Sequence, residues 1–234
     1  MSETVFDTPA ESRTLADRAY DAIADAIVRG ELPLGARLSE AALGKRFAVG
    51  RGPLREALRR LEGRKLVVVR PNAGARVVSL TLRDIVELYQ IREALEALAC
   101  QLATERMTDA ELDAMERLLD EHDRDPAHGR ASSRTAEVPD FHTAVVKGSK
   151  SRQLIDLLCG EFFDLLRIYR FRSSGETGRA PVAFDEHREI LAAIRRRDSE
   201  LAANLMRNHV RRSRLNVLRQ HGAVDLLSSE SPGG

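Results

Sequence analysis

The sequence lacks tryptophan altogether, and aromatic residues make up only 4% of it. Proteins that bind single-stranded nucleic acid usually stack successive bases on aromatic side chains, so this shortage argues against such a binder. Only two cysteines are present, Cys100 and Cys159, and they do not have the spacing of metal ligands. They indicate buried thiols in a reducing compartment rather than a disulfide framework.

Long apolar runs are missing too, so the sequence predicts no membrane span. The first residues, MSETVFDTPAESR, are polar and acidic and do not follow the basic-then-apolar layout of a secretion signal. We therefore expect a cytoplasmic protein. Its 234 residues, 43% of them hydrophobic, suffice for one large or two modest domains with packed cores.

The stretch 41–66 carries the clearest pattern in the chain, which is a helix, a tight turn and a second helix. The second helix has a buried stripe at helical spacing, formed by Leu54, Ala57, Leu58 and Leu61. An adjacent outward arc carries arginines four residues apart, namely Arg51, Arg55 and Arg59. Gly50 stands at the expected N-cap, and Pro53 in the first turn needs no N–H there. This pattern is typical of a helix-turn-helix, whose second helix enters the major groove of DNA by its N-terminal end.

Basic charge is concentrated around this motif. From Lys45 to Arg76 the chain has ten basic and two acidic residues, a net charge of +8, whereas the whole chain has a net charge of +1. The other residues together therefore carry −7. Such a local excess is expected where a protein lies on a phosphate backbone. On charge alone, the alternative is a solvated arginine face of an amphipathic helix.

Two β-branched runs follow the second helix and flank the turn residues 71–74. They predict a small hairpin, or wing, over residues 67–79. Gly74 at its tip has no Cβ that would keep the backbone away from a phosphate. Together with the helix-turn-helix, the wing predicts a winged-helix DNA-binding domain over residues 12–79.

The run AVGRGPLREALRRLEGRKLVVVRPNAGARVV resembles the winged helix of the GntR family of bacterial transcription regulators. The resemblance implies that Arg51, Arg55 and Gly74 contact DNA. The family usually has a hydroxyl residue on each side of the first arginine, where this chain has Gly50 and Gly52. Backbone N–H groups, including that of Gly52, would then bind the phosphates. We expect Lys45 and Arg59 to bind phosphates regardless of base sequence.

Helical patterns without strand signals occupy the rest of the chain. A helix over about 13–29 and a connector over 33–38 are expected before the helix-turn-helix. After the wing, capping residues and apolar spacing predict helices that begin near 81 and 108, and further helices over about 139–147, 151–172, 181–196 and 198–220. The polar stretch 124–137 has no periodicity and is expected to form a loop. The overall prediction is a mostly α protein with an N-terminal winged helix-turn-helix and a C-terminal antiparallel all-helical bundle over 81–222.

Four strings of this second domain, LYQIREALEALA, FHTAV, DEHREIL and MRNHV, resemble signatures of the helical ligand-binding domain in the FadR-like subfamily of GntR regulators. This domain is of the type called FCD. With the first domain included, the resemblance covers residues 13–220. It implies a homodimer in which the second domain binds a small organic acid as effector.

Three of the six histidines, His142, His187 and His209, lie on apolar stripes of three different predicted helices. One such histidine is usually a core residue, but imidazoles from facing helices of a bundle can converge on one metal ion. The resemblance implies that these three bind a divalent metal together with an aspartate one turn before the first. This chain has Val138 at that position, which leaves a three-imidazole site to be closed by water or an effector carboxylate. Zinc suits imidazole best, and nickel, cobalt and manganese remain alternatives.

Arg92 follows Ile91, which is expected in the core, and two roles for it remain open. It is predicted either to bind an anionic effector or to form a salt bridge with Glu93 or Glu96. The sequence and the resemblance together predict a dimeric, ligand-responsive transcription regulator, more often a repressor in this family, that binds a palindromic double-stranded DNA operator. The alternatives are a metal-dependent hydrolase built on the three histidines and a non-specific architectural DNA binder. The hydrolase lacks a clearly placed general base and leaves the basic first domain unexplained.

Overall fold

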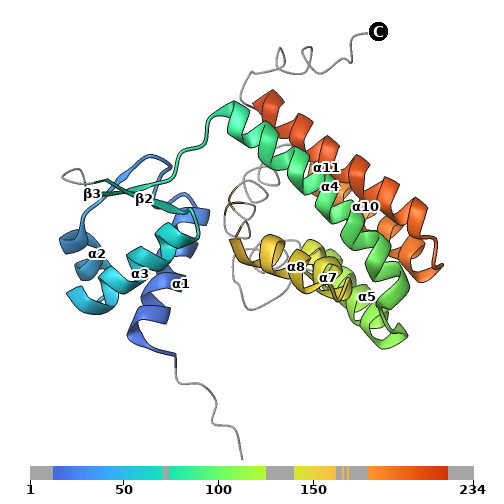
Figure 1. Ribbon diagram of the computed structural model, residues 1–234, viewed down its shortest axis with the longest axis horizontal. Coiled ribbons are helices and arrows are strands. Elements are labelled where there is room, and N and C mark those ends of the chain that lie inside the picture. Colours follow the sequence, from blue (N-terminus) through green and yellow to red (C-terminus); the bar gives the residue numbers. More distant parts are fainter. Residues whose placement is uncertain are drawn as a thin grey trace, which may run out of the picture.

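The computed structural model describes residues 13–70, 74–124, 140–161, 165, 168 and 179–220. Within these residues the chain is mostly helical with one small sheet, as predicted. The first three helices and the sheet form one group of elements, and the later helices form a second group (Figure 1). Val138, the expected loop 124–137 beyond its first residue and the wing turn 71–73 lie outside the described residues.

Three short helices form the first group: α1 (Leu15–Val28), α2 (Glu40–Arg46) and α3 (Arg51–Gly63). Gly50 is the N-cap of α3, as the sequence predicts. The side chain of Ser39 caps α2 by accepting a hydrogen bond from the N–H of Ala42. A capping box between Thr14 and Asp17 begins α1, and this motif was not predicted. The apolar stripe of α3 is buried, and α3 packs against α1.

The sheet has three antiparallel strands in the order β1-β3-β2. The predicted hairpin forms β2 (Val67–Arg70) and β3 (Gly74–Val77). The expectation of a plain connector over 33–38 is wrong in part, because its last two residues form β1 (Arg37–Leu38) on the free edge of β3. A two-residue strand carries too little alternation to be recognised in the sequence. The winged helix therefore has a three-stranded sheet at its outer end.

The second group consists only of helices, and its long elements run side by side in Figure 1. Their bounds are α4 Leu82–Arg106, α5 Asp109–Arg124, α7 Phe141–Gly148, α8 Arg152–Ile155, η1 Asp156–Glu161, α10 Arg179–Arg195 and α11 Ser199–Gln220. Helix α4 packs along α11 and α7, and a Thr81–Asp84 capping box begins it as predicted. The expected helix over 151–172 is interrupted, because α8 passes into the π-helical segment η1. No helix in the described part of the chain is long and apolar enough to cross a membrane.

Some residues assigned to the core of this bundle are exposed. Ile91 has a relative exposure of 45%, so the expectation that it is buried is wrong, and Leu98 and Leu201 on apolar stripes are exposed as well, at 43% and 36%. Arg92, one residue further along α4, is buried instead at 1%. Apolar residues occur on more than one face of α4, and spacing alone therefore did not identify which face points inward.

The two groups of elements touch at the C-terminal end of α3. Arg64, the C-cap of α3, donates a hydrogen bond from its guanidinium to the carbonyl oxygen of Gly160 in η1. Since π-helical turns often mark functional positions, this contact links the second helix of the helix-turn-helix to a distinctive segment of the bundle.

Candidate DNA-binding surface and histidine site

The N-terminal end of α3 presents its arginines to solvent. Arg51 is the first residue of the helix, and Arg51, Gly52, Arg55 and Arg59 are all exposed because the opposite face packs against α1. A Cβ added at Gly52 would meet no atom within 4 Å, so nothing in the described chain covers that backbone. The helix thus offers an uncovered N-terminal turn, which is the part that enters a major groove.

The three arginines of the arc differ in their partners. Arg55 pairs with Glu40 at 3.0 Å, and Arg59 pairs with Glu56 at 2.6 Å. Arg51 forms no ion pair with any carboxylate that the structure describes. DNA would have to replace two exposed ion pairs, which are each worth little, whereas Arg51 is ready to bind.

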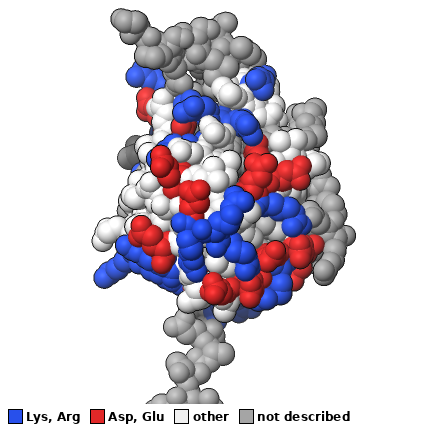
Figure 2. Space-filling view, turned by 90° about the vertical axis from the view of Figure 1, so that its right-hand side faces the viewer, with Lys and Arg blue, Asp and Glu red and all other residues white. Residues whose placement is uncertain are grey.

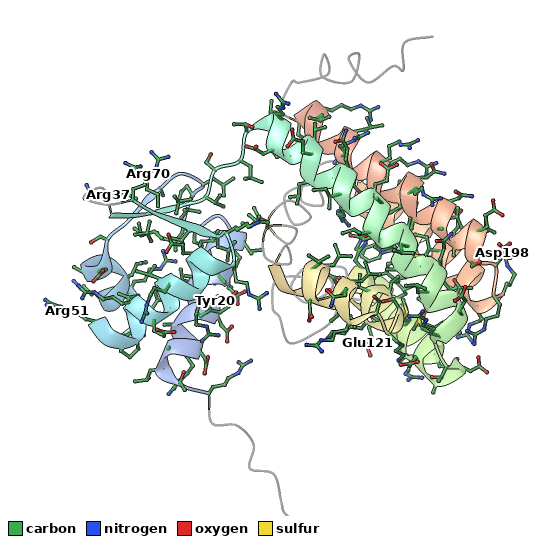
Figure 3. All side chains as sticks on the ribbon, viewed as in Figure 1. Tyr20, Arg37, Arg51, Arg70, Glu121 and Asp198 are labelled. Atoms are coloured by element: carbon green, nitrogen blue, oxygen red, sulfur yellow. The ribbon has the colours of Figure 1, made fainter. Side chains whose placement is uncertain are left out.

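Lys45 and Gly74 flank α3 at the two edges of this surface. Lys45 is exposed in the last turn of α2. Gly74 begins β3 with a φ of +75°, a left-handed conformation that favours glycine. Figure 3 places Arg51, Arg37 and Arg70 at the end of the molecule that points away from the bundle. On the opposite side, the bundle shows acidic and basic side chains interspersed (Figure 2).

The three predicted histidines meet in the centre of the bundle. His142 lies on α7, His187 on α10 and His209 on α11, and their relative exposures are 7%, 8% and 3%. The Nε2 atom of His209 lies 3.3 Å from Nε2 of His142 and 3.3 Å from Nε2 of His187. Ligand atoms of all three rings lie within 4.8 Å of one another. No fourth histidine, cysteine or carboxylate among the described residues joins this group.

Two buried glutamates orient two of these rings by hydrogen bonds. Oε2 of Glu96 lies 2.6 Å from Nδ1 of His142, and Oε2 of Glu186 lies 2.7 Å from Nδ1 of His209. A carboxylate accepts only, so each neutral imidazole donates its Nδ1–H and keeps a bare Nε2. No role was predicted for Glu186, although it directly precedes His187, and Glu96 was predicted only as a possible partner of Arg92. The sequence did offer one signal, which is a glutamate directly before a histidine predicted to bind metal.

This arrangement fits a divalent metal ion. In the neutral imidazoles, the bare nitrogens of His142 and His209 face each other at 3.3 Å with no proton between them. Nitrogens bound to zinc at about 2.0–2.1 Å in a tetrahedral site are roughly 3.3 Å apart. A cation between the rings would therefore fit the observed spacing and relieve the repulsion of two lone pairs. The donor set of three imidazoles suits zinc or nickel.

Asp140, the carboxylate nearest to His142 in the α7 sequence, has another role. It is the N-cap of α7 and accepts a hydrogen bond of 2.8 Å from the N–H of Thr143. No carboxylate that the structure describes therefore fills the position of the family's aspartate.

Arg92 is buried beside the histidines. Its Nε bonds Oε1 of Glu96 at 2.5 Å, and its Nη2 lies 3.2 Å from both ring nitrogens of His142. A position equally close to both nitrogens lies over the face of the ring, away from the Nε2 lone pair. Glu93, the other partner considered from the sequence, instead pairs with Arg211 at 2.8 Å. The Nη1 atom of Arg92 has no hydrogen-bond partner among the described residues.

Burial and charge set the protonation of this centre. Burial lowers the pKa of His209 to about 4, although the hydrogen bond that His209 donates to Glu186 opposes the shift. Burial alone would raise the pKa of Glu96, but the charge of Arg92 and the hydrogen bonds that Glu96 accepts from His142 and Arg92 outweigh it and hold that pKa well below its usual range. His209 is thus neutral near pH 7, the form that binds metal, and Glu96 is ionised.

Comparison with known protein families agrees with both parts of this description. The model of the bacterial regulatory proteins of the gntR family matches residues 15–77, and the FCD domain model matches residues 87–212. The chain is also 33% identical over 205 residues to the HTH-type transcriptional repressor GlaR of Escherichia coli, a match that covers 79% of this chain and 87% of that one. The chain belongs to the GntR family.

Other GntR regulators are similar at the same level. The HTH-type transcriptional regulator YdhC of Bacillus subtilis is 32% identical over 184 residues, covering 78% of this chain and 82% of YdhC. A solved GntR structure from Rhodococcus sp. RHA1 has a TM-score of 0.70 over 87% of this chain and 97% of its own, with 23% identity, and so supports the fold alone. As a GntR regulator with an FCD domain, the protein is a ligand-responsive DNA-binding transcription regulator rather than an enzyme. The hydrolase alternative has no support among these relatives.

Proposed function

We propose that this GntR regulator binds a palindromic operator as a homodimer and represses transcription until a small organic acid binds its helical domain. Residues 12–79 form the DNA-binding unit of this proposal, and residues 81–222 form the effector-binding and dimerisation unit. Repression is favoured because a relative that is similar over most of its length, GlaR, is a repressor. A regulator of chromosomal DNA is expected in the cytoplasm.

The observation that carries the DNA-binding part is the free N-terminal turn of α3. Arg51 has no carboxylate partner in the described chain and stands where a guanidinium can grip O6 and N7 of a guanine. Arg55 follows one turn later and is released by breaking a single exposed ion pair with Glu40. Lys45, Arg59, Gly52 and Gly74 surround this pair and bind phosphates, which fixes the position of the helix without reading bases.

The dimer is supported by an apolar strip on the outside of α4. The strip combines the exposed Ile91 and Leu98 with the partly buried Leu95 and Leu102, at steps of four, three and four residues. These side chains share one face of the helix and remain accessible in the single chain. We propose that this strip packs against the same strip of a second copy of the chain. A dimer is expected because a single recognition helix contacts too little DNA to select an operator.

The effector site is proposed at the meeting of Arg92 and the three histidines. Three neutral imidazoles leave a bound divalent metal with its full positive charge and open coordination positions. An organic carboxylate would supply the negative charge that the three histidines lack. Nη1 of Arg92 is buried without a partner in the described chain and is available for the same carboxylate. The effector class is therefore a small carboxylic acid.

One experiment tests the chain of proposals in order. Duplexes are first selected from a random library with the full-length protein. The selected duplex is then titrated with protein in the presence of each of a panel of small carboxylic acids. The same titrations are repeated after a chelator has removed the metal. The expected result is a palindromic duplex that one carboxylic acid releases, and that metal removal makes insensitive to the acid. Selection of no duplex would refute operator binding. Unchanged release after complete metal removal would refute the metal-dependent effector site.

A further inference from the structure

Three arginines lie on the outer face of the winged-helix sheet. In the register of the sheet, Arg37 of β1 lies directly opposite Arg76 of β3, and Arg70 of β2 lies opposite Gly74. Side chains alternate along a strand, so these four positions share one face, and all four are exposed. The other face is buried against the helices through Leu38, Ala75 and Val77. We call Arg37, Arg70 and Arg76 the sheet arginines.

The sheet arginines are placed at an electrostatic cost. Like charges directly opposite each other on neighbouring strands destabilise a sheet, and Arg37 faces Arg76 in this way. None of the three forms an ion pair with a carboxylate that the structure describes, and Arg76 donates one hydrogen bond of 3.1 Å to the carbonyl of Gly35. By contrast, Arg55 and Arg59 on the neighbouring helix both have glutamate partners. A bound anion would neutralise the repulsion that the fold itself leaves uncompensated.

The Arg37 side chain reaches the tip of the wing. Its Nε lies 4.0 Å from the position that a Cβ on Gly74 would occupy, so this guanidinium lies beside the backbone at the wing tip. Figure 3 shows Arg37 and Arg70 at the same outer end of the molecule as Arg51. A duplex with its major groove on α3 would therefore lie at the same end of the molecule as these arginines.

We propose that the sheet arginines form a second DNA-binding face, which holds the phosphate backbone next to the half-site read by α3. The inference rests on the proposed operator binding and extends it to β1, a strand that lies outside the hairpin. Arg37, which lies on that strand, is the residue that distinguishes this face from the wing alone. Arg37 is expected to increase the affinity for DNA and the salt dependence of binding. It should add no preference for particular bases, because the phosphates are the same at every base pair.

The test uses the full-length protein and a duplex selected by the wild type. Replacing Arg37 by alanine removes one phosphate contact per protomer, so the slope of log affinity against log salt should become shallower by about 1.8 per dimer. Affinity at 0.15 M salt should fall by roughly 10- to 30-fold, with the same loss on every sequence. Arg37→Lys should retain most of the affinity. The control Arg196→Ala removes an exposed arginine near Asp198, at the far end of the bundle (Figure 3), and should change neither quantity.

A stability measurement separates this role from a structural one. Without DNA, Arg37→Ala should unfold at the same temperature as the wild type or higher, because it removes one member of a like-charge pair. Wild-type affinity and wild-type salt slope in both Arg37→Ala and the double variant Arg37→Ala/Arg76→Ala would overturn the inference. The proposed function would survive that result, whereas failure of the wild type to select any duplex would refute both.

Discussion

Nδ1 of His142 lies 2.6 Å from Oε2 of Glu96, while the other oxygen of the same carboxylate accepts a hydrogen bond from Nε of Arg92. Glu96 thus connects the proposed metal ligand directly to the proposed effector-binding arginine. A carboxylic acid that approaches Arg92 changes the field at Glu96 and, through it, the basicity of His142. Metal and effector are therefore expected to change each other's affinity by the same factor.

Glu186→Gln should weaken metal binding without removing any proposed ligand. The glutamate accepts from Nδ1 of His209 and fixes the ring with Nε2 toward the site, and loss of such a partner typically costs 10- to 100-fold in affinity. Zinc titration of the full-length protein measures the effect, and nitrogen NMR of the histidines reports the tautomer. Glu189→Gln, an exposed change on the same helix, is the control. Equal zinc affinity in the wild type and both variants would show that Glu186 has no such role.

His187→Ala should abolish metal uptake and effector response but leave operator binding largely intact. The residue lies on α10, where its ring stacks on Phe141 and meets His209 inside the helical bundle. Metal analysis of untagged protein and operator titration with the effector give the two readouts. If the wild-type protein takes up no metal and still responds normally to its effector, the three histidines have a purely structural role.

Arg51→Ala should reduce operator affinity by about 1–3 kcal/mol and relax the preference at one base pair in each half-site. The matched change Lys45→Ala should weaken every duplex alike and make the salt slope shallower, since a phosphate contact carries no base information. Selection from a random library with each variant, followed by titration at several salt concentrations, tells the two apart. If base preference is unaltered in Arg51→Ala, α3 does not read the operator through this residue.

Leu98→Glu should convert the proposed dimer to a monomer at micromolar concentration. The substitution puts a charge in the middle of the apolar strip of α4, while the side chain is already 43% exposed in the single chain and its replacement should not unfold the bundle. Sedimentation equilibrium of the full-length protein measures the change. Ala192→Glu, an exposed change on α10, should leave the dimer unaffected. A dimeric Leu98→Glu protein would place the interface elsewhere.

His209 should make the metal-free protein sensitive to acid. Its pKa is lowered from 6.5 to about 4, chiefly by burial. Between these two pH values His209 is therefore protonated in the unfolded chain and neutral in the folded chain. Its contribution to the unfolding free energy should therefore fall between pH 6.5 and 4, by on the order of 3 kcal/mol in total. Urea unfolding of wild type and His209→Gln across this range measures it. The stability difference between the two should shrink as the pH falls, and parallel curves would contradict the assignment.

Local signals predicted a large part of this molecule. The arginine arc and the apolar stripe of α3 were predictable because an amphipathic helix repeats one pattern over several turns. The histidines were predictable because imidazole on an apolar stripe is uncommon. The sequence did not reveal β1, which is two residues long and exists only because β3 offers it a partner. It also missed the glutamates behind the rings, since Glu96 and His142 are distant in the chain and meet only after packing.

The inward face of α4 shows the limit most clearly. Ile91 and Arg92 are neighbours, and hydrophobicity places the isoleucine inside. The structure buries the arginine instead, at 1% exposure, because Glu96 one turn later neutralises it and His142 lies under its guanidinium. The exposed isoleucine belongs to a surface that we assign to a second molecule. Both exceptions to the simple pattern therefore fall on surfaces for which we propose a function, and functional surfaces are where local rules are expected to fail.

The Arg92–Glu96 pair also constrains how this regulator can evolve. Removing one partner of a buried ion pair leaves the other charged and without compensation, which typically costs about 3–5 kcal/mol, a large share of a domain's stability. A lineage that replaces either residue alone passes through a poorly folded intermediate, so the two positions are expected to change together or not at all. Descendants that respond to a new acid should then differ elsewhere around the histidines, with this pair inherited intact.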